Sequence, residues 1–198
     1  MKTLIVNSYH ANANKKIEPY VKLVSQHSEF KVEKDVNAHK DYNLFGYDAV
    51  ILSGSPGLIS LGIYPKRYPE FLVNLEIPTL GICYGHQMLA FAFGAGIKSG
   101  KRIEGYETVK ILEPDELFKG IPNEIVVNQS HQEFIVPETL PQTGFFLLAE
   151  SDSCRIEAIR HSKLPLYGTQ FHFERSGEIG EMIIKNFYEN IVKKRMKI

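Results

Sequence analysis

Two kinds of hydrophobic pattern alternate along the first half of the chain. Short apolar runs rich in β-branched residues predict buried strands at residues 3–6, 30–36, 48–53 and 77–82. Apolar residues at helical spacing predict helices over about residues 17–27 and 85–93. Strands and helices that alternate in this way indicate an α/β fold, in which a mostly parallel sheet carries helices on both faces.

The second half of the chain has a different pattern. Short strand-like segments follow one another without long helices between them, at residues 108–112, 124–127, 145–150, 157–160 and 166–171. They predict a mixed or antiparallel extension of the sheet. The chain then closes with a predicted helix over residues 177–194, whose apolar stripe includes Ile179, Ile183 and Phe187. We expect residues 1–198 to form a single domain.

Composition narrows the possible functions and locations. The chain has 198 residues, of which 43% are hydrophobic, so the core should need no disulfide or metal to be stable. Basic and acidic residues are equal at 23 each, which argues against a nucleic-acid partner. The apolar runs are too short for a membrane span or a secretory signal. With only two cysteines no disulfide framework is expected, and the reducing cytoplasm is the expected compartment.

Cys83 lies in the segment Gly-Ile-Cys-Tyr-Gly, between a predicted buried strand and a predicted helix. This is the setting of a nucleophile elbow, a sharp turn that needs small residues on both sides; Gly81 and Gly85 supply them. The N-terminus of the following helix would favour the thiolate, the reactive form of cysteine. Cys154 has no such setting, and we interpret it as structural.

A thiolate nucleophile needs a base and a group that orients the base. His172 and Glu174 are two residues apart at the end of the last predicted strand, so their side chains should face the same side. The turn at residues 54–57 follows a strand that should neighbour the Cys83 strand. We expect the backbone N–H groups of Ser55 and Tyr84 to form an oxyanion hole there.

These residues resemble the motifs of class I glutamine amidotransferases. The similar segments are Gly-Ile-Cys-Tyr-Gly-His-Gln at 81–87, Gln-Phe-His-Phe-Glu at 170–174 and Val-Ile-Leu-Ser-Gly-Ser-Pro at 50–56. Within the family, the sequence is similar to glutaminase subunits of two-subunit GMP synthetases, through residues 105–106, 129–131, 151–158 and 164–168. The resemblance implies a flavodoxin-like α/β fold.

The resemblance also implies a reaction, in which glutamine is hydrolysed to glutamate and ammonia through a thioester. Cys83 would be the nucleophile, His172 the base and Glu174 its orienting group. Gln87 and the backbone of Ser130, His131 and Gln132 would bind the amino-acid end of glutamine. No metal and no organic cofactor is expected. An ATP-dependent synthetase subunit would accept the ammonia.

The sequence departs from the family pattern at three places. Ser55 and Phe173 stand where the family usually has glycine and proline, and the loop at residues 7–16 lacks the usual Gly-Gln pattern. Ser55 bears most on activity, because its amide could need a conformation that glycine adopts more easily. Two alternatives therefore stay open: a cysteine hydrolase acting on peptides or γ-glutamyl compounds, and a catalytically weak regulatory homologue.

Overall fold

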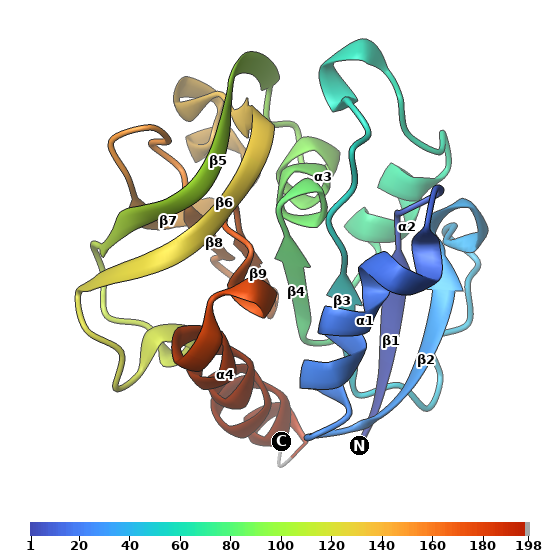
Figure 1. Cartoon of the computed structure of the whole chain (residues 1–198). Helices are drawn as coiled ribbons and strands as arrows, with labels where there is room; N and C mark the ends of the chain where they lie inside the picture. The colour runs from blue at the N-terminus through green and yellow to red at the C-terminus, as the bar shows by residue number, and fades with distance from the viewer. Residues whose placement is uncertain (197–198) are drawn as a thin grey trace.

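One nine-stranded mixed sheet organises the chain, in a computed structural model that describes residues 1–196 (Figure 1). The strand order is β2-β1-β3-β4-β9-β8-β7-β5-β6, parallel from β2 to β9 and antiparallel from β9 to β6. The strands are β1 (Lys2–Asn7), β2 (Glu29–Lys34), β3 (Ala49–Leu52), β4 (Thr79–Ile82), β5 (Ile97–Ile111), β6 (Glu124–Ile135), β7 (Phe145–Glu150), β8 (Ala158–His161) and β9 (Leu166–Thr169). The predicted α/β fold with a parallel half and an antiparallel extension is confirmed.

Helices cover both faces of the parallel half (Figure 1). They are α1 (Ala13–Val24), α2 (Tyr68–Val73), α3 (Tyr84–Ala92), α4 (Gly177–Asn186), a π-helical turn (Phe187–Val192) and α5 (Lys193–Arg195). Strand alternation divides the core between the faces. Ile5 of β1 packs in the cluster that includes residues of α1 and α4, whereas Leu4 and Val6 pack in the cluster that includes residues of α2 and α3.

Several predicted boundaries were wrong. α1 begins at Ala13, so part of the expected 7–16 loop is helical, and β2 ends at Lys34, before a short 3-10 turn. α2 was not predicted at all, because six residues are too few to show a helical period. The expected strands at 108–112 and 124–127 are the ends of the much longer β5 and β6.

β5 and β6 form a long ribbon that returns toward the middle of the sheet (Figure 1). An isolated antiparallel bridge joins Asn128 of β6 to His172, and the His172 N–H donates to the Asn128 carbonyl at 2.8 Å. The free edge of β6 therefore lies beside the segment that follows β9. This closure brings the far edge of the sheet to the carboxyl ends of the parallel strands, where ligands bind in open α/β sheets.

Candidate active site

Cys83 stands between β4 and α3 in a strained backbone conformation. Its φ of 50° and ψ of −105° are unusual for a residue with a side chain. The flanking glycines are required by close packing: a Cβ on Gly81 would lie 2.6 Å from the carbonyl of Gly85, and one on Gly85 would lie 2.5 Å from the carbonyl of Leu52. The geometry is that of the predicted elbow.

His172 and Glu174 form a buried pair. His172 Nδ1 lies 2.6 Å from Glu174 Oε1, and both side chains are almost fully excluded from solvent. Burial alone would lower the pKa of His172, but the Glu174 carboxylate and the Cys83 sulfur raise this pKa to about 10. The site therefore favours a charged imidazolium, which is the partner that a reactive thiolate needs.

The contact between His172 and Glu174 was predicted, but the geometry behind it was not. β9 ends at Thr169, and Glu174 lies in a 3-10 turn, Phe173–Arg175, rather than in an extended segment. The turn folds the carboxylate back under the imidazole. Phe173 points away into the core, where it is 2% exposed, so its difference from the usual proline is a packing change, as expected.

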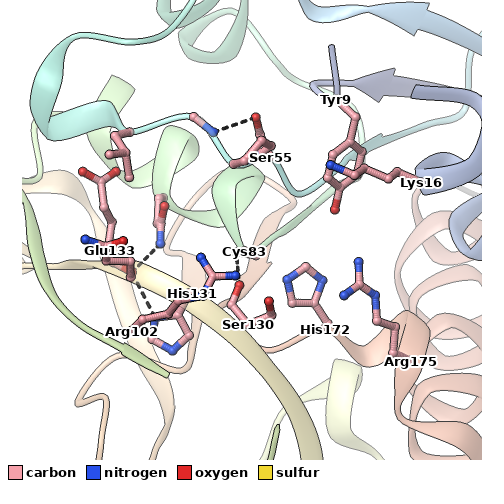
Figure 2. A pocket seen from close by; sticks show the side chains of 15 residues that line it. Tyr9, Lys16, Ser55, Cys83, Arg102, Ser130, His131, Glu133, His172 and Arg175 are labelled. Carbon is pink, nitrogen blue, oxygen red and sulfur yellow. Dashed lines mark hydrogen bonds between the residues drawn. The ribbon is translucent and has the colours of Figure 1, made fainter. Parts of the chain in front are cut away.

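A cavity of about 290 Å³ opens above Cys83 (Figure 2). Its lining includes the side of the elbow, His172, the turn after β3 and β6. The Cys83 thiol is directed at the Ser130 carbonyl, 3.8 Å from its sulfur. The predicted residues Ser55, Gln87, Ser130, His131 and Gln132 line this cavity together with Cys83 and His172. Glu174 lies behind His172, and Tyr84 is not part of the lining.

The turn after β3 approaches the base closely at Gly54. A Cβ there would lie 2.7 Å from the Tyr9 hydroxyl and 3.0 Å from His172 Cε1, so only glycine fits without displacing a side chain. The Gly54 N–H donates to the Tyr20 hydroxyl at 3.0 Å. Ser55 follows without a positive φ, so its Cβ causes no backbone strain.

Gln87 reaches from α3 to the wall formed by β6. Its side-chain nitrogen donates to the Glu133 carbonyl at 2.6 Å and to Gln170 Oε1 at 2.9 Å. His131 Nδ1 lies 3.1 Å from the same Glu133 carbonyl (Figure 2). The segment that contains Ser130 and His131 was interpreted as a loop, but it is part of β6. Gln87 thus fixes the cavity wall as well as lining it.

Sequence reasoning missed five residues of the cavity wall: Tyr9, Lys16, Arg102, Glu133 and Arg175. Three of them are cationic, and they come from segments far apart in the chain. The Glu133 carboxylate accepts hydrogen bonds from the N–H groups of Ile59 and Ser60, which follow the turn after β3. No local motif marks such residues, because only the folded ribbon brings β5 and β6 to the cavity.

The family model for class-I glutamine amidotransferases matches residues 4–191 of the chain. The chain belongs to this family. It is 44% identical over 145 residues to the glutamine-hydrolysing subunit of GMP synthase from Archaeoglobus fulgidus, covering 72% of this chain and 75% of the relative. The subunit of the same name from Pyrococcus abyssi is 38% identical over 164 residues, covering 80% and 84%.

A solved structure supports the same relationship. The crystal structure of a GMP synthase subunit from Thermoplasma acidophilum superposes with a TM-score of 0.84 at 26% sequence identity. The match covers 100% of this chain and 96% of the other. No helix within residues 1–196 is long and apolar enough to cross a membrane.

Proposed function

We propose that this protein is the glutaminase subunit of a two-subunit GMP synthetase. It hydrolyses the side-chain amide of glutamine and delivers the ammonia to an ATP-dependent synthetase subunit. The observation that carries the proposal is the position of Cys83: a strained elbow cysteine at the cavity floor, beside the buried pair of His172 and Glu174. The names of the relatives support the choice of reaction and partner.

In the first half of the reaction, the Cys83 sulfur attacks the amide carbonyl of glutamine and forms a tetrahedral intermediate. The N–H groups of Ser55 and Tyr84 stabilise its oxyanion. His172 holds the proton that came from the thiol and gives it to the departing amine, so ammonia leaves and a γ-glutamyl thioester remains. Glu174 keeps the imidazole oriented and charged.

In the second half, His172 accepts a proton from water, and the resulting hydroxide attacks the thioester. Glutamate leaves and the thiolate is restored, with His172 protonated again. No metal or cofactor enters either half of this reaction. Gln87 and the segment from Ser130 to Gln132 hold the amino-acid end of the substrate at the β6 wall. The cavity volume of about 290 Å³ is small for a ligand site and suits one amino acid better than a peptide.

Both cysteines are free, a state that a reducing compartment preserves. We therefore assign the enzyme to the cytoplasm. The electrically balanced composition continues to argue against a nucleic-acid partner.

A glutamine analogue with an electrophilic side chain tests the nucleophile. We expect one adduct per chain, mapped to the peptide that contains Cys83, and loss of glutaminase activity in Cys83→Ala. An adduct on Cys154, or full activity of Cys83→Ala, would refute the proposal. The alternative hydrolase is tested in the same assay, because γ-glutamyl peptides should be poor substrates compared with glutamine.

A reconstitution experiment tests the partner. The chain is mixed with a GMP synthetase subunit that can use ammonium salt alone. We expect the mixture to accept glutamine as its nitrogen source, and the Cys83→Ala variant to leave only the ammonium-dependent reaction. We also expect the isolated chain to be a weak glutaminase. An activation of about 100-fold by the loaded synthetase needs only about 2.7 kcal/mol of transition-state stabilisation.

A further inference from the structure

Three residues that commonly bind metals meet behind the β6 wall. They are His131 of β6 and Cys154 and Glu157 from the segment between β7 and β8. One ligand atom of each residue lies within 4.8 Å of the other two, and all three residues are at most 5% exposed. The cluster is separate from the nucleophile and its base, and the proposed reaction uses neither Cys154 nor Glu157.

His131 is held in the form that binds metals. Its Nδ1 lies 3.1 Å from the Glu133 carbonyl, so this nitrogen carries the proton and donates it (Figure 2). The other ring nitrogen, Nε2, is then a lone pair, and it is buried without a hydrogen-bond partner in residues 1–196. A histidine whose Nδ1–H is fixed by a backbone carbonyl and whose Nε2 is free has the usual arrangement of a metal ligand.

Glu157 shows the same division between a fixed atom and a free atom. Its Oε1 accepts hydrogen bonds from Gln129 Nε2 and from Ser151 Oγ, each at 2.7 Å. Its Oε2 is fully buried and has no partner among the described residues. Two polar neighbours therefore orient the carboxyl group and leave one oxygen unused. Buried polar atoms are nearly always paired, so two unpaired atoms in one cluster require an explanation.

Cys154 completes the set with a sulfur ligand. Its thiol is 4% exposed and makes only a long contact of 3.5 Å with the Ile156 carbonyl. Its N–H donates to Ser151 Oγ, the same hydroxyl group that donates to Glu157. The local turn thus presents the thiol and the carboxyl group to the same side.

The charge balance of the cluster favours a divalent cation. Burial raises the pKa of Cys154 and raises that of Glu157 to about 7, while it lowers the pKa of His131. An unoccupied cluster is therefore close to neutral. A divalent ion bound by a thiolate, a carboxylate and a neutral imidazole is also neutral overall, so the bound ion would not be an uncompensated buried charge. The nearby Glu107 adds a negative potential at all three residues.

We propose that His131 Nε2, Cys154 Sγ and Glu157 Oε2 form a zinc-binding site that joins β6 to the segment between β7 and β8. Nitrogen, sulfur and oxygen ligands together suit Zn²⁺, which takes three protein ligands and keeps a fourth position open. On binding, Zn²⁺ displaces the thiol proton of Cys154 and any proton on Glu157, and no oxidation occurs. Tetrahedral zinc places its ligand atoms about 3.3–3.8 Å apart, so the side chains need to close by only about 1 Å.

The site has a structural role in this proposal, because His131 adjoins Ser130, the residue whose carbonyl receives the Cys83 thiol. An ion at His131 would hold the β6 wall in place without entering the cavity chemistry. This differs from the expectation, drawn from the sequence alone, that the chain has no metal site. The two ideas are compatible in one respect: the ion takes no part in the hydrolysis.

Cobalt provides a direct test, since a thiolate bound to Co²⁺ gives a charge-transfer absorption in the near ultraviolet. The full chain is stripped with a chelator and titrated with Co²⁺ and then with Zn²⁺. We expect one ion per chain, the thiolate absorption, its loss when Zn²⁺ displaces Co²⁺, and a higher melting temperature with Zn²⁺. A wild-type chain that binds no stoichiometric ion would overturn the proposal without any variant.

Variants identify the ligands. Cys154→Ser should remove the absorption, and Glu157→Gln should weaken binding at least tenfold, with circular dichroism confirming that each variant folds. Cys154→Ala replaces the serine variant if the latter is unfolded. Cys83→Ser is the matched control, because it removes the only other thiol and should keep both the absorption and the stoichiometry. Loss of the signal in Cys83→Ser with retention in Cys154→Ser or Cys154→Ala would place the ion at the catalytic cysteine and refute the proposal.

Discussion

The hydroxyl of Ser55 donates to the Ser8 carbonyl at 2.9 Å and accepts from the Gly57 N–H at 3.0 Å. These two hydrogen bonds fasten the turn after β3 to the loop after β1 and to its own next corner. The glycine that the family usually has here could make neither bond. Serine at this position therefore restricts a turn that is proposed to supply an oxyanion donor.

We predict that Ser55→Gly raises the glutaminase activity of the isolated chain on the order of tenfold, because the freed peptide can aim its N–H at the oxyanion. The measurement is steady-state ammonia release at saturating glutamine. Ser55→Ala is the matched control, since it removes the hydroxyl but keeps the Cβ. Unchanged or lower activity in Ser55→Gly would mean that serine does not hold the donor away.

The charge on Glu174 should set the alkaline limit of activity. Because Glu174 raises the pKa of His172, Glu174→Gln should lower that pKa and shift the alkaline limb of kcat/KM to lower pH. We also expect kcat to fall roughly 10²- to 10⁴-fold. Glu178→Gln, a change at the exposed start of α4, should leave the pH profile unaltered. An identical profile in Glu174→Gln would exclude the electrostatic role.

The elbow glycines should be intolerant of any side chain. Gly85→Ala places a Cβ against the Leu52 backbone, which cannot move as a flexible side chain can, so we expect a loss of about 1–3 kcal/mol in the free energy of unfolding. Gly96→Ala is the control, because its Cβ would meet only side-chain atoms at 3.4 Å or more. Urea unfolding of both variants checks this. Equal stability of the two would show that the elbow can relax.

His86 should make the fold sensitive to acid. It is fully buried, and the backbone groups of Gly168 and Ile156 near the ring make no hydrogen bond of ordinary geometry with it, so burial lowers its pKa to about 3. Between pH 6.5 and 3 the unfolded chain binds the proton and the folded chain does not, so stability falls as the pH falls below 6.5. At pH 5 the loss amounts to about 2 kcal/mol.

The measurement is the free energy of unfolding between pH 7 and pH 5. In His86→Gln the slope with pH should be smaller, whatever the stability of this variant at pH 7. The pKa of His131 is lowered by burial too, and its contribution to the slope is common to both proteins. A slope that did not change in His86→Gln would assign the acid sensitivity to other groups.

The parallel half of the fold and the nucleophile were readable from the sequence for local reasons. A strand buried on both faces is a continuous apolar run, and an elbow needs glycine at fixed distances from its nucleophile, so β4 and Cys83 stand out within seven residues. β5 was not readable over most of its length. Its ribbon is exposed on both faces between Lys98 and Glu107, so it has no hydrophobic alternation.

The same physics explains what was missed at the site. Lys16 and Arg102 reach the cavity only because α1 begins earlier than expected and the ribbon returns to the sheet. The pairing of His172 with Glu174 was predicted from strand alternation, although a 3-10 turn makes it. The spacing of two residues is compatible with both backbones, so the sequence identified the partners without identifying the geometry.

The bridge between Asn128 and His172 also has a consequence during synthesis. The ribosome completes the nucleophile and its elbow long before it reaches the base, and His172 is positioned only when it meets a strand already made. A nascent or truncated chain therefore carries a thiol without its imidazole partner. Glutamine is protected from wasteful cleavage by incomplete chains, because the order of translation delays the assembly of the reactive pair until almost the whole sheet exists.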